Sequence, residues 1–355
     1  MSGSGKYTLA GIMSGTSLDG LDIALCEISG DEKGYNYTIL KADTIPYQAE
    51  QKNKLRSLPY LNVENYFKLH HQYGKFIGKE VNEFIRKNGI KPHAVASHGH
   101  TVFHQPQKGF TTQIGCGATI AATTGLPTIC DFRSLDVALK GQGAPLVPIG
   151  DKLLFGAYKS CLNIGGIANI SFDKNGSRAA FDICVANMAL NHYAALAGSD
   201  YDKNGDWARA GNFNQELFDQ LNQLEFYKVK TAKSMGREWF EDEFLFLVQK
   251  SKLQVNDVLN TLVHHIAFQI AAVLNENKLE DVLITGGGAH NTFLIETIKN
   301  YYKGTVIIPS ADIVNYKEAL IFAFLGYLRL FKKVNTLSSV TGAIQDSVGG
   351  AVYHM

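Results

Sequence analysis

The sequence predicts an α/β protein of two domains, formed by duplication of one arrangement of strands and helices. Its 355 residues exceed one typical domain and suit two. Two hairpins with glycine turns, within Tyr7–Ile28 and Leu162–Phe172, lie about 150 residues apart, and each opens a run of strands followed by helices. Polar side chains also follow several of the predicted strands. That pattern is typical of an α/β protein whose ligand cleft is lined from both sides.

The composition is that of a folded soluble protein, with 45% hydrophobic and 19% charged residues. A formal net charge of +1 provides no global field to attract nucleic acid or an anionic membrane, so any anion site must be local. The five cysteines are scattered and form no CxxC pair, which predicts neither disulfides nor zinc. Because no export signal or membrane-spanning run is recognisable, we expect a cytoplasmic protein without nucleic-acid or membrane partners.

The segment GIMSGTSLDGLDIAL predicts a phosphate-binding loop between two strands, Tyr7–Met13 and Leu21–Ile28. Its turn residues combine backbone freedom with hydroxyl and carboxylate groups, and they are Ser14, Gly15, Thr16, Ser17, Asp19 and Gly20. Glycines let the backbone approach an anion, and Asp19 or Asp22 could hold Mg²⁺ directly or through water. An ordinary polar hairpin turn is the alternative.

The remainder of the first half alternates between strands and helices. Strands are expected at Tyr35–Asp43, which extends the first hairpin, and at Ala94–Ser97 and Pro127–Cys130. Apolar spacings of three and four predict a long amphipathic helix over Glu64–Arg86, and small residues predict another over Ala118–Thr124.

A polar loop, SHGHTVFHQP, is expected to follow the strand at Ala94–Ser97. His98, His100 and His104 lie within seven residues, so a metal site is one interpretation. No carboxylate or cysteine completes a zinc-like set nearby, and a loop at a strand end is a common position for ligand recognition. Hydrogen bonding to a polar substrate is therefore favoured.

Asp131 and Arg133 directly follow the strand at Pro127–Cys130. They precede Asp136 and a flexible turn at Gly141–Pro145. An exposed ion pair is one interpretation. Binding of a sugar or phosphate is the other, because charged groups at a strand end beside a flexible loop suit both ligands.

The second half repeats the first pattern, with LNIGGIANI as a strand, a Gly165-Gly166 turn and another strand. Asp182 follows a short strand and precedes a predicted helix at Asn187–Leu196. It either caps that helix or directs a carboxylate into the cleft.

A third glycine segment, Gly286–Gly288, follows the predicted strand Val282–Thr285. Bare backbone there allows a flat ring or a sugar to lie against the chain, and the following helix N-terminus can face phosphate. A tight packing turn is the alternative. Helices are also expected over Leu259–Lys278 and Ala319–Phe331, the second beginning at Glu318.

These segments together resemble the blocks of the anhydro-N-acetylmuramic acid kinases, a family of the sugar kinase, Hsc70 and actin superfamily. The matching blocks run from residue 11 to about residue 343, and they are GIMSGTSLDGLD, SHGHTVFHQP, DFRSLDVALKGQGAPLVP, LNIGGIANIS, YDKNGDWARAG, KSMGRE, ITGGGAHN, KEALIFAFL and SVTGA. The resemblance implies two ribonuclease H-like (actin/hexokinase-type) domains around a central ATP and substrate cleft. We expect residues 1–130 plus 335–355 in the first domain and 131–334 in the second.

The resemblance implies an enzyme that uses ATP and Mg²⁺ on 1,6-anhydro-N-acetylmuramic acid from recycled cell wall. Water opens the anhydro bridge at C1, deprotonated by Asp182, while O6 receives the γ-phosphoryl group. A homodimer is also implied. The implied nucleotide-binding residues are Ser14, Gly15, Thr16, Ser17, Asp19, Gly20, Asp22, Asn163, Gly165, Gly166, Gly286, Gly287, Gly288 and Asn291. The implied substrate-binding residues are His98, His100, Thr101, Asp131, Arg133 and Glu318.

The chain departs from the family pattern at two places. Members typically read DTGPGN at the catalytic block, whereas this chain keeps only Asp182 and Asn187 of it and has Ile183-Cys184-Val185-Ala186 between them. We therefore expect a differently shaped pocket beside the base, and a kinase for another amino sugar or anhydrosugar is an alternative. Many superfamily members have Asp where this chain has Met13, so a metal carboxylate must come from Asp19, Asp22 or Asp182. A catalytically weak nucleotide-binding regulatory protein is a further alternative.

Overall fold

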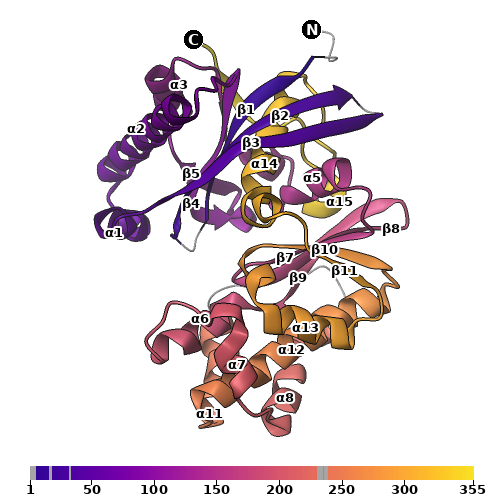
Figure 1. Cartoon of the computed structure of the whole chain (residues 1–355). Coiled ribbons are helices and arrows are strands. Elements are labelled where there is room, and N and C mark those ends of the chain that lie inside the picture. Colours follow the sequence, from indigo (N-terminus) through magenta and orange to yellow (C-terminus); the bar gives the residue numbers. More distant parts are fainter. Residues whose placement is uncertain (1–4, 16–17, 32, 230–234, 236–238) are drawn as a thin grey trace. The chain divides into compact units, whose positions relative to one another are not determined.

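The computed structural model describes residues 5–15, 18–31, 33–229, 235 and 239–355. The chain divides into two compact units, residues 1–155 with 316–355 and residues 156–315 (Figure 1). Each unit has one mixed β-sheet covered by helices.

The first unit contains a seven-stranded sheet in the order β12-β6-β4-β1-β2-β3, with β5 paired to β4. Its strands are β1 (Tyr7–Ser14), β2 (Gly20–Asp31), β3 (Gly34–Pro46), β4 (Ala94–Gln105), β5 (Phe110–Ile114), β6 (Thr128–Cys130) and β12 (Ala351–Tyr353). Its helices are α1 (Ala49–Ser57), α2 (Val63–Asn88), α3 (Gly117–Thr124), α4 (Ser134–Ala138), α5 (Val147–Leu154), α15 (Ser338–Thr341) and most of α14 (Ala311–Leu330).

The second unit contains a five-stranded sheet in the order β11-β10-β7-β8-β9. Its strands are β7 (Ser160–Ile164), β8 (Ile167–Lys174), β9 (Ser177–Val185), β10 (Asp281–Thr285) and β11 (Thr305–Ile307). Its α-helices are α6 (Asn187–Leu196), α7 (Asp206–Ala210), α8 (Gln215–Asn222), α9 (Glu225–Lys228), α11 (Phe246–Lys250), α12 (Val255–Glu276) and α13 (Thr292–Tyr301). A π-helical segment, Phe240–Leu245, precedes α11.

The two sheets share one topology, which confirms the predicted duplication and the α/β fold class. In each unit the first three strands form an antiparallel meander, β1-β2-β3 or β7-β8-β9. In each, the fourth strand, β4 or β10, then pairs in parallel with the first strand of the meander. A further parallel strand, β6 or β11, follows on the outer side.

The predicted domain boundaries differ from the observed division. Residues 131–155 and 316–334 were expected in the second domain, but they group with the first unit. Packing explains the difference, because Phe155, at the end of α5, lies with its ring 5.3 Å from that of Tyr37 on β3. As predicted, the C-terminal tail rejoins the first unit, where β12 pairs with β6.

Helices cover both faces of the first sheet. On one face, Ile12 and Ile23 pack in a core with Ile77 and Phe84 of α2. On the other face, α14 approaches β1 so closely that a Cβ on Gly11 would overlap the carbonyl oxygen of Ala319. Burial of apolar residues on both faces explains why β1 reads as a continuous hydrophobic run.

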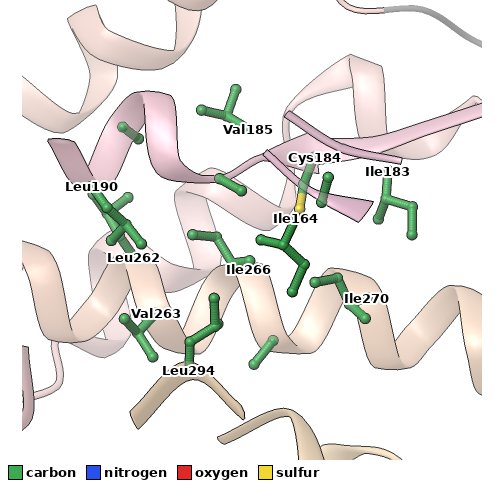
Figure 2. Close-up of a cluster of buried hydrophobic side chains, with 14 of the residues drawn as sticks. Ile164, Ile183, Cys184, Val185, Leu190, Leu262, Val263, Ile266, Ile270 and Leu294 are labelled. Atoms are coloured by element: carbon green, nitrogen blue, oxygen red, sulfur yellow. The ribbon is translucent and has the colours of Figure 1, made fainter. Parts of the chain in front are cut away.

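The core of the second unit is formed where α12 packs against β7, β9, α6 and α13 (Figure 2). Helix α12 is long and apolar enough to cross a membrane by length and composition, but most of it is buried inside the unit. Its buried residues include Leu262, Val263, Ile266 and Ile270, which contact the core shown in Figure 2. This helix is therefore a core element, in agreement with its predicted amphipathic pattern.

We predict that Gly11→Ala lowers the free energy of unfolding by about 1–3 kcal/mol, because the added methyl group forces α14 away from β1. Urea denaturation measures the change. Gly34→Ala is the matched control, because no atom lies within 4 Å of a Cβ at that position in β3. An equal effect of the two substitutions would contradict the close packing of α14 on β1.

Candidate functional site

The loop between β1 and β2 carries the first group of predicted nucleotide-binding residues. Ser14 ends β1 and Gly20 begins β2, and a Cβ on Gly20 would lie 2.6 Å from the carbonyl oxygen of Ile45. The backbone N–H of Leu18 donates to the carbonyl of Gly15 at 3.3 Å. The predicted Thr16 and Ser17 lie outside the described residues. The strand-loop-strand prediction is confirmed for this segment, and phosphate binding stays a prediction.

The Ser14 side chain belongs to a buried chain of hydrogen bonds. The hydroxyl of Tyr47 donates to Ser14 Oγ at 2.7 Å, and the hydroxyls of Tyr47 and Tyr73 lie 2.5 Å apart. Ser14 Oγ also lies 3.0 Å from Nδ1 of His100. Burial lowers the pKa of His100 to about 4, so its imidazole is neutral at physiological pH. His100, predicted to bind substrate, is thus bonded to the end of β1.

Two carboxylates lie beside this loop. Asp19 is exposed, whereas Asp22 is partly buried on β2, where Oδ1 accepts a 2.6 Å hydrogen bond from the hydroxyl of Thr44. Burial raises the pKa of Asp22, and the negative charge of Asp19 raises it further. A cation would relieve both effects, and Mg²⁺ commonly uses only one or two protein carboxylates together with substrate phosphates. The pair fits such a site, although the described residues contain no cluster of three or more metal-binding side chains.

His98 and Arg133 are joined directly. Nε and an Nη of Arg133 donate to Nε2 of His98 at 3.0 and 2.9 Å, and the other Nη donates to the carbonyl of Gly143 at 2.8 Å. Since arginine only donates, Nε2 of His98 is the acceptor, and its Nδ1–H donates to the carbonyl of Gly99 at 2.9 Å. Burial and the charge of Arg133 hold the pKa of His98 well below its ordinary value. His98 therefore orients Arg133 through Nε2, while the bond from Nδ1 to Gly99 fixes the imidazole ring itself.

Asp136 supports Arg133 indirectly, because it holds Gly143, whose carbonyl accepts from Arg133. The carboxylate of Asp136 accepts hydrogen bonds from the Gly143 N–H and the Thr341 hydroxyl, both at 2.7 Å. Burial lowers the pKa of Arg133 to about 10, which still leaves the guanidinium charged at neutral pH. The segment that sequence analysis treated as a flexible turn is thus tied to the C-terminal SVTGA block.

Glu318 lies on α14, within electrostatic reach of both Asp22 and Arg133. Burial raises the pKa of Glu318, the charges of Lys317 and Arg133 lower it, and that of Asp22 raises it. Lys317 itself forms a buried ion pair with Asp151 of α5 at 2.9 Å. The first unit therefore brings Asp22, Arg133 and Glu318 near one another, although they were predicted from separate segments.

Other predicted substrate residues have local roles. Asp131 is exposed, and its Oδ1 accepts hydrogen bonds from both the backbone N–H and the hydroxyl of Ser134, the first residue of α4. No ion pair joins Asp131 to Arg133 in the described part of the chain. Thr101 lies on β4 and accepts a weak 3.4 Å hydrogen bond from Gln113. Sugar contacts by Asp131 and Thr101 stay predictions.

The prediction of a polar loop after Ser97 is wrong, because β4 continues to Gln105 and pairs with β5. His98, His100 and His104 therefore lie on a strand. Their hydrogen-bond partners are Arg133, Ser14 and Thr111 respectively, so no two of the rings share a partner. The alternative of a metal site formed by these histidines finds no support among the described residues.

In the second unit, two glycine segments meet at Asn163. Gly165 and Gly166 form the turn between β7 and β8, and their carbonyls accept hydrogen bonds from the backbone of residues 186–188. Gly286, at φ +84°, follows β10, and a Cβ there would lie 2.5 Å from Oδ1 of Asn163. Asn291 caps α13 by accepting from the Leu294 N–H at 2.9 Å.

Gly287 differs from its glycine neighbours because it is exposed and only Asn187 lies near the position of an added Cβ. Gly286 and Gly288 are instead required for packing against Asn163 and Ile164. Two of the glycines therefore serve packing, as the interpretation of a packing turn predicts, and the third leaves bare backbone. Nucleotide binding by these residues stays a prediction.

Asp182 lies within β9, half-buried, and its Oδ2 accepts a 2.9 Å hydrogen bond from the backbone N–H of Met235. Helix α6 has Ala186 as its N-cap residue and no side-chain cap, so the interpretation of Asp182 as a helix cap is wrong. Met235 is the one described residue of the KSMGRE block. That block therefore reaches the predicted catalytic carboxylate.

The residues that replace the family's TGPG turn are buried. Ile183, Cys184, Val185 and Ala186 are each at most 1% exposed, and they contribute to the core in which Figure 2 shows the first three. Their side chains pack against α12 and its neighbours. The expectation that they reshape a pocket beside Asp182 is therefore not supported by their burial.

Sequence reasoning missed several residues that hold the predicted ones. Thr44, Tyr47 and Tyr73 bond to Asp22 or to the Ser14 chain, yet they lie in unremarkable segments of β3 and α2 and just after β3. Strand register could have identified Thr44, because it is the cross-strand partner of Asp22. Lys317 could be noticed in the sequence because it precedes Glu318, but its ion-pair partner Asp151 lies in a distant segment and could not.

Comparison with known proteins agrees with these blocks along nearly the whole chain. The model of a family described as Anhydro-N-acetylmuramic acid kinase matches residues 7–355. A protein of that name from Sulfurovum sp. is 35% identical, over 98% of this chain and 99% of its own length. Another from Vibrio cholerae is 34% identical, over 97% of each chain. The relative of the same name from Sulfurimonas denitrificans is 32% identical over 97% of this chain and 98% of its own.

Among solved structures, similarity is weaker. The activator of the 2-hydroxyisocaproyl-CoA dehydratase from Clostridium difficile, with bound ADPNP, has a TM-score of 0.44 at 12% identity, covering 89% of this chain and 92% of its own. Such values add nothing to the assignment, which depends on the full-length sequence matches. By those matches, this chain belongs to the anhydro-N-acetylmuramic acid kinase family.

Proposed function

We propose that this protein is an ATP-dependent anhydro-N-acetylmuramic acid kinase that opens the 1,6-anhydro ring and phosphorylates O6. The product is N-acetylmuramic acid 6-phosphate, formed during cell-wall recycling. The observation that carries the proposal is the family match over residues 7–355, which includes Asp182. In support of the proposal, the polar side chains described above for each unit lie mainly in segments that match the family's sequence blocks.

In the proposed reaction, Asp182 accepts a proton from water as the water oxygen bonds to C1 of the sugar. The C1–O6 bond breaks, and the electron pair left on O6 attacks the γ-phosphorus of ATP, releasing ADP. The Met235 N–H holds Oδ2 of Asp182 in place, which fixes the direction of the base. A general base of this kind typically contributes a factor of about 10²–10⁴ to the rate.

The remaining roles follow from charge and backbone geometry. Arg133, held by His98 and Gly143, offers a fixed positive charge to the sugar or its transferring phosphoryl group. Mg²⁺ would be held by Asp22 with Asp19 and would neutralise charge on the phosphates of ATP. Gly165, Gly166 and Gly287 would lie against the nucleotide. We also propose a cytoplasmic homodimer, as the family resemblance implies.

We predict that the wild-type protein, incubated with ATP, Mg²⁺ and the anhydrosugar in water enriched in oxygen-18, forms product with one heavy oxygen at C1 and phosphate at O6. Mass spectrometry measures both. Asp182→Asn should retain ATP binding and lose about 10²–10⁴-fold in rate, because the amide cannot accept the proton. Intact sugar with the wild-type protein would contradict the proposed function.

We predict that Asp22→Asn stabilises the metal-free protein at pH 7–8 while it weakens Mg²⁺-dependent turnover. The raised pKa means that the folded state favours the neutral carboxyl, so stability is lost as pH rises through that pKa. The amide removes this loss and retains an acceptor for Thr44. The gain should shrink as pH falls toward the ordinary value of 3.8, which thermal unfolding across pH measures.

Asp43→Asn is the control for that substitution, because Asp43 is a half-exposed carboxylate on β3 that pairs with Lys87 at 3.1 Å. It should give no pH-dependent gain in stability and leave the Mg²⁺ requirement unchanged. Equal Mg²⁺ concentration curves for Asp22→Asn and the wild type would exclude Asp22 as a metal ligand.

We predict that Ile183→Thr destabilises the fold by about 1–3 kcal/mol, because it places a hydroxyl in an apolar core. Discrimination between 1,6-anhydro-N-acetylmuramic acid and 1,6-anhydro-N-acetylglucosamine, measured as a ratio of kcat/KM, should change by no more than about twofold. A change of more than about tenfold would instead favour the alternative that this segment selects a different sugar.

A further inference from the structure

Tyr47 contacts both ends of the loop between β1 and β2. Its hydroxyl donates to Ser14 Oγ at 2.7 Å, and its backbone N–H donates to the carbonyl of Asp19 at 3.3 Å. Tyr47 follows the last residue of β3, Pro46, so it is anchored to the same sheet as the loop. One residue from outside the loop therefore contacts both Ser14 and Asp19.

The hydrogen bonds around Tyr47 have a defined direction. Because the Tyr47 hydroxyl gives its one proton to Ser14, its oxygen accepts from the hydroxyl of Tyr73, which lies 2.5 Å away. Ser14 Oγ, which accepts from Tyr47, forms a further hydrogen bond with Nδ1 of His100 at 3.0 Å. Tyr73 and Tyr47 are thus successive donors, and the chain ends in the hydrogen bond between Ser14 and His100.

This chain is sealed from solvent and uncharged. Ser14, Tyr47, Tyr73 and His100 are at most 6% exposed. Burial raises the pKa of both tyrosines and lowers that of His100, so all four groups are neutral at physiological pH. Hydrogen bonds in such surroundings are costly to leave incomplete, which makes the arrangement rigid.

We propose that Tyr47 is a positioning residue for ATP, because it holds the two ends of the β1–β2 loop, at Ser14 and Asp19, through the Tyr73–Tyr47–Ser14–His100 chain and through its own backbone N–H. The inference rests on the proposed function and adds a residue to it. It also changes the role of Ser14, whose hydroxyl group is engaged inside the protein by Tyr47 and His100. Ser14 then acts through its backbone and through the fixed end of β1.

The test is Tyr47→Phe, which removes only the hydroxyl, with Tyr73→Phe as a second variant that removes the donor to Tyr47. Loss of one hydrogen bond should raise the KM for ATP by about fivefold to tenfold and leave the KM for the anhydrosugar within about twofold. Tyr73→Phe should show a smaller change in the same direction, because the bond from Tyr47 to Ser14 persists.

Tyr327→Phe is the matched control. Tyr327 is equally buried in the first unit, and its hydroxyl donates to the Gly30 carbonyl at 3.0 Å, away from the loop. It should show the wild-type KM for ATP even where its thermal stability falls as much as that of Tyr47→Phe. An unchanged KM for ATP in Tyr47→Phe, or an equal rise in both KM values, would overturn the proposal.

Nucleotide affinity separates this proposal from the proposed function. If the wild-type protein binds a non-hydrolysable ATP analogue but does not convert the sugar, the proposed function fails while calorimetry still tests Tyr47. Weaker binding of the analogue to Tyr47→Phe than to Tyr327→Phe and wild type supports the positioning role. Equal binding by all three overturns it.

Discussion

The close approach of α14 to β1 at Gly11 is the constraint on which the arrangement of the first unit depends. Only a hydrogen atom fits between the Gly11 backbone and the carbonyl of Ala319, so the height and rotation of α14 over the sheet are fixed at that point. Glu318 is the neighbour of Ala319, and its charge therefore falls near Asp22 and Arg133. A packing requirement in a strand thus determines the electrostatics of a site.

The charged forms of Asp22, Glu318 and Arg133 are disfavoured by burial, and a bound ion of opposite charge would stabilise them. Burial raises the pKa of both Asp22 and Glu318, while burial lowers that of Arg133. All three groups therefore favour their neutral forms more than they would in water. A bound cation and an anionic ligand would offset the free-energy cost of desolvating these charged groups, which the protein alone does not fully offset. The neutral histidines beside them supply orientation and add no charge of their own.

The sequence was informative where a pattern is local, and less so where partners meet from distant segments. Periodicity identified α2 and α12, and glycine pairs identified both hairpins. The strand β4 was predicted too short, because its histidines read as a polar loop although strand pairing with β5 decides their conformation. Blocks resembling the family located Asp182, but Tyr47 and Asp151 depend on tertiary contacts that no sequence spacing predicts.

The two units have the same topology yet stabilise their first turns by different means. In the second unit, the carbonyls of Gly165 and Gly166 are held by backbone N–H groups of residues 186–188, directly after β9. In the first unit, the equivalent turn is longer and is spanned by the Tyr47 side chain and backbone. A backbone-held turn tolerates sequence change nearby, which explains how Ile183–Ala186 can join the core without disturbing it. In the longer loop, the ends at Ser14 and Asp19 are held instead from outside, by one hydroxyl and one backbone N–H of Tyr47.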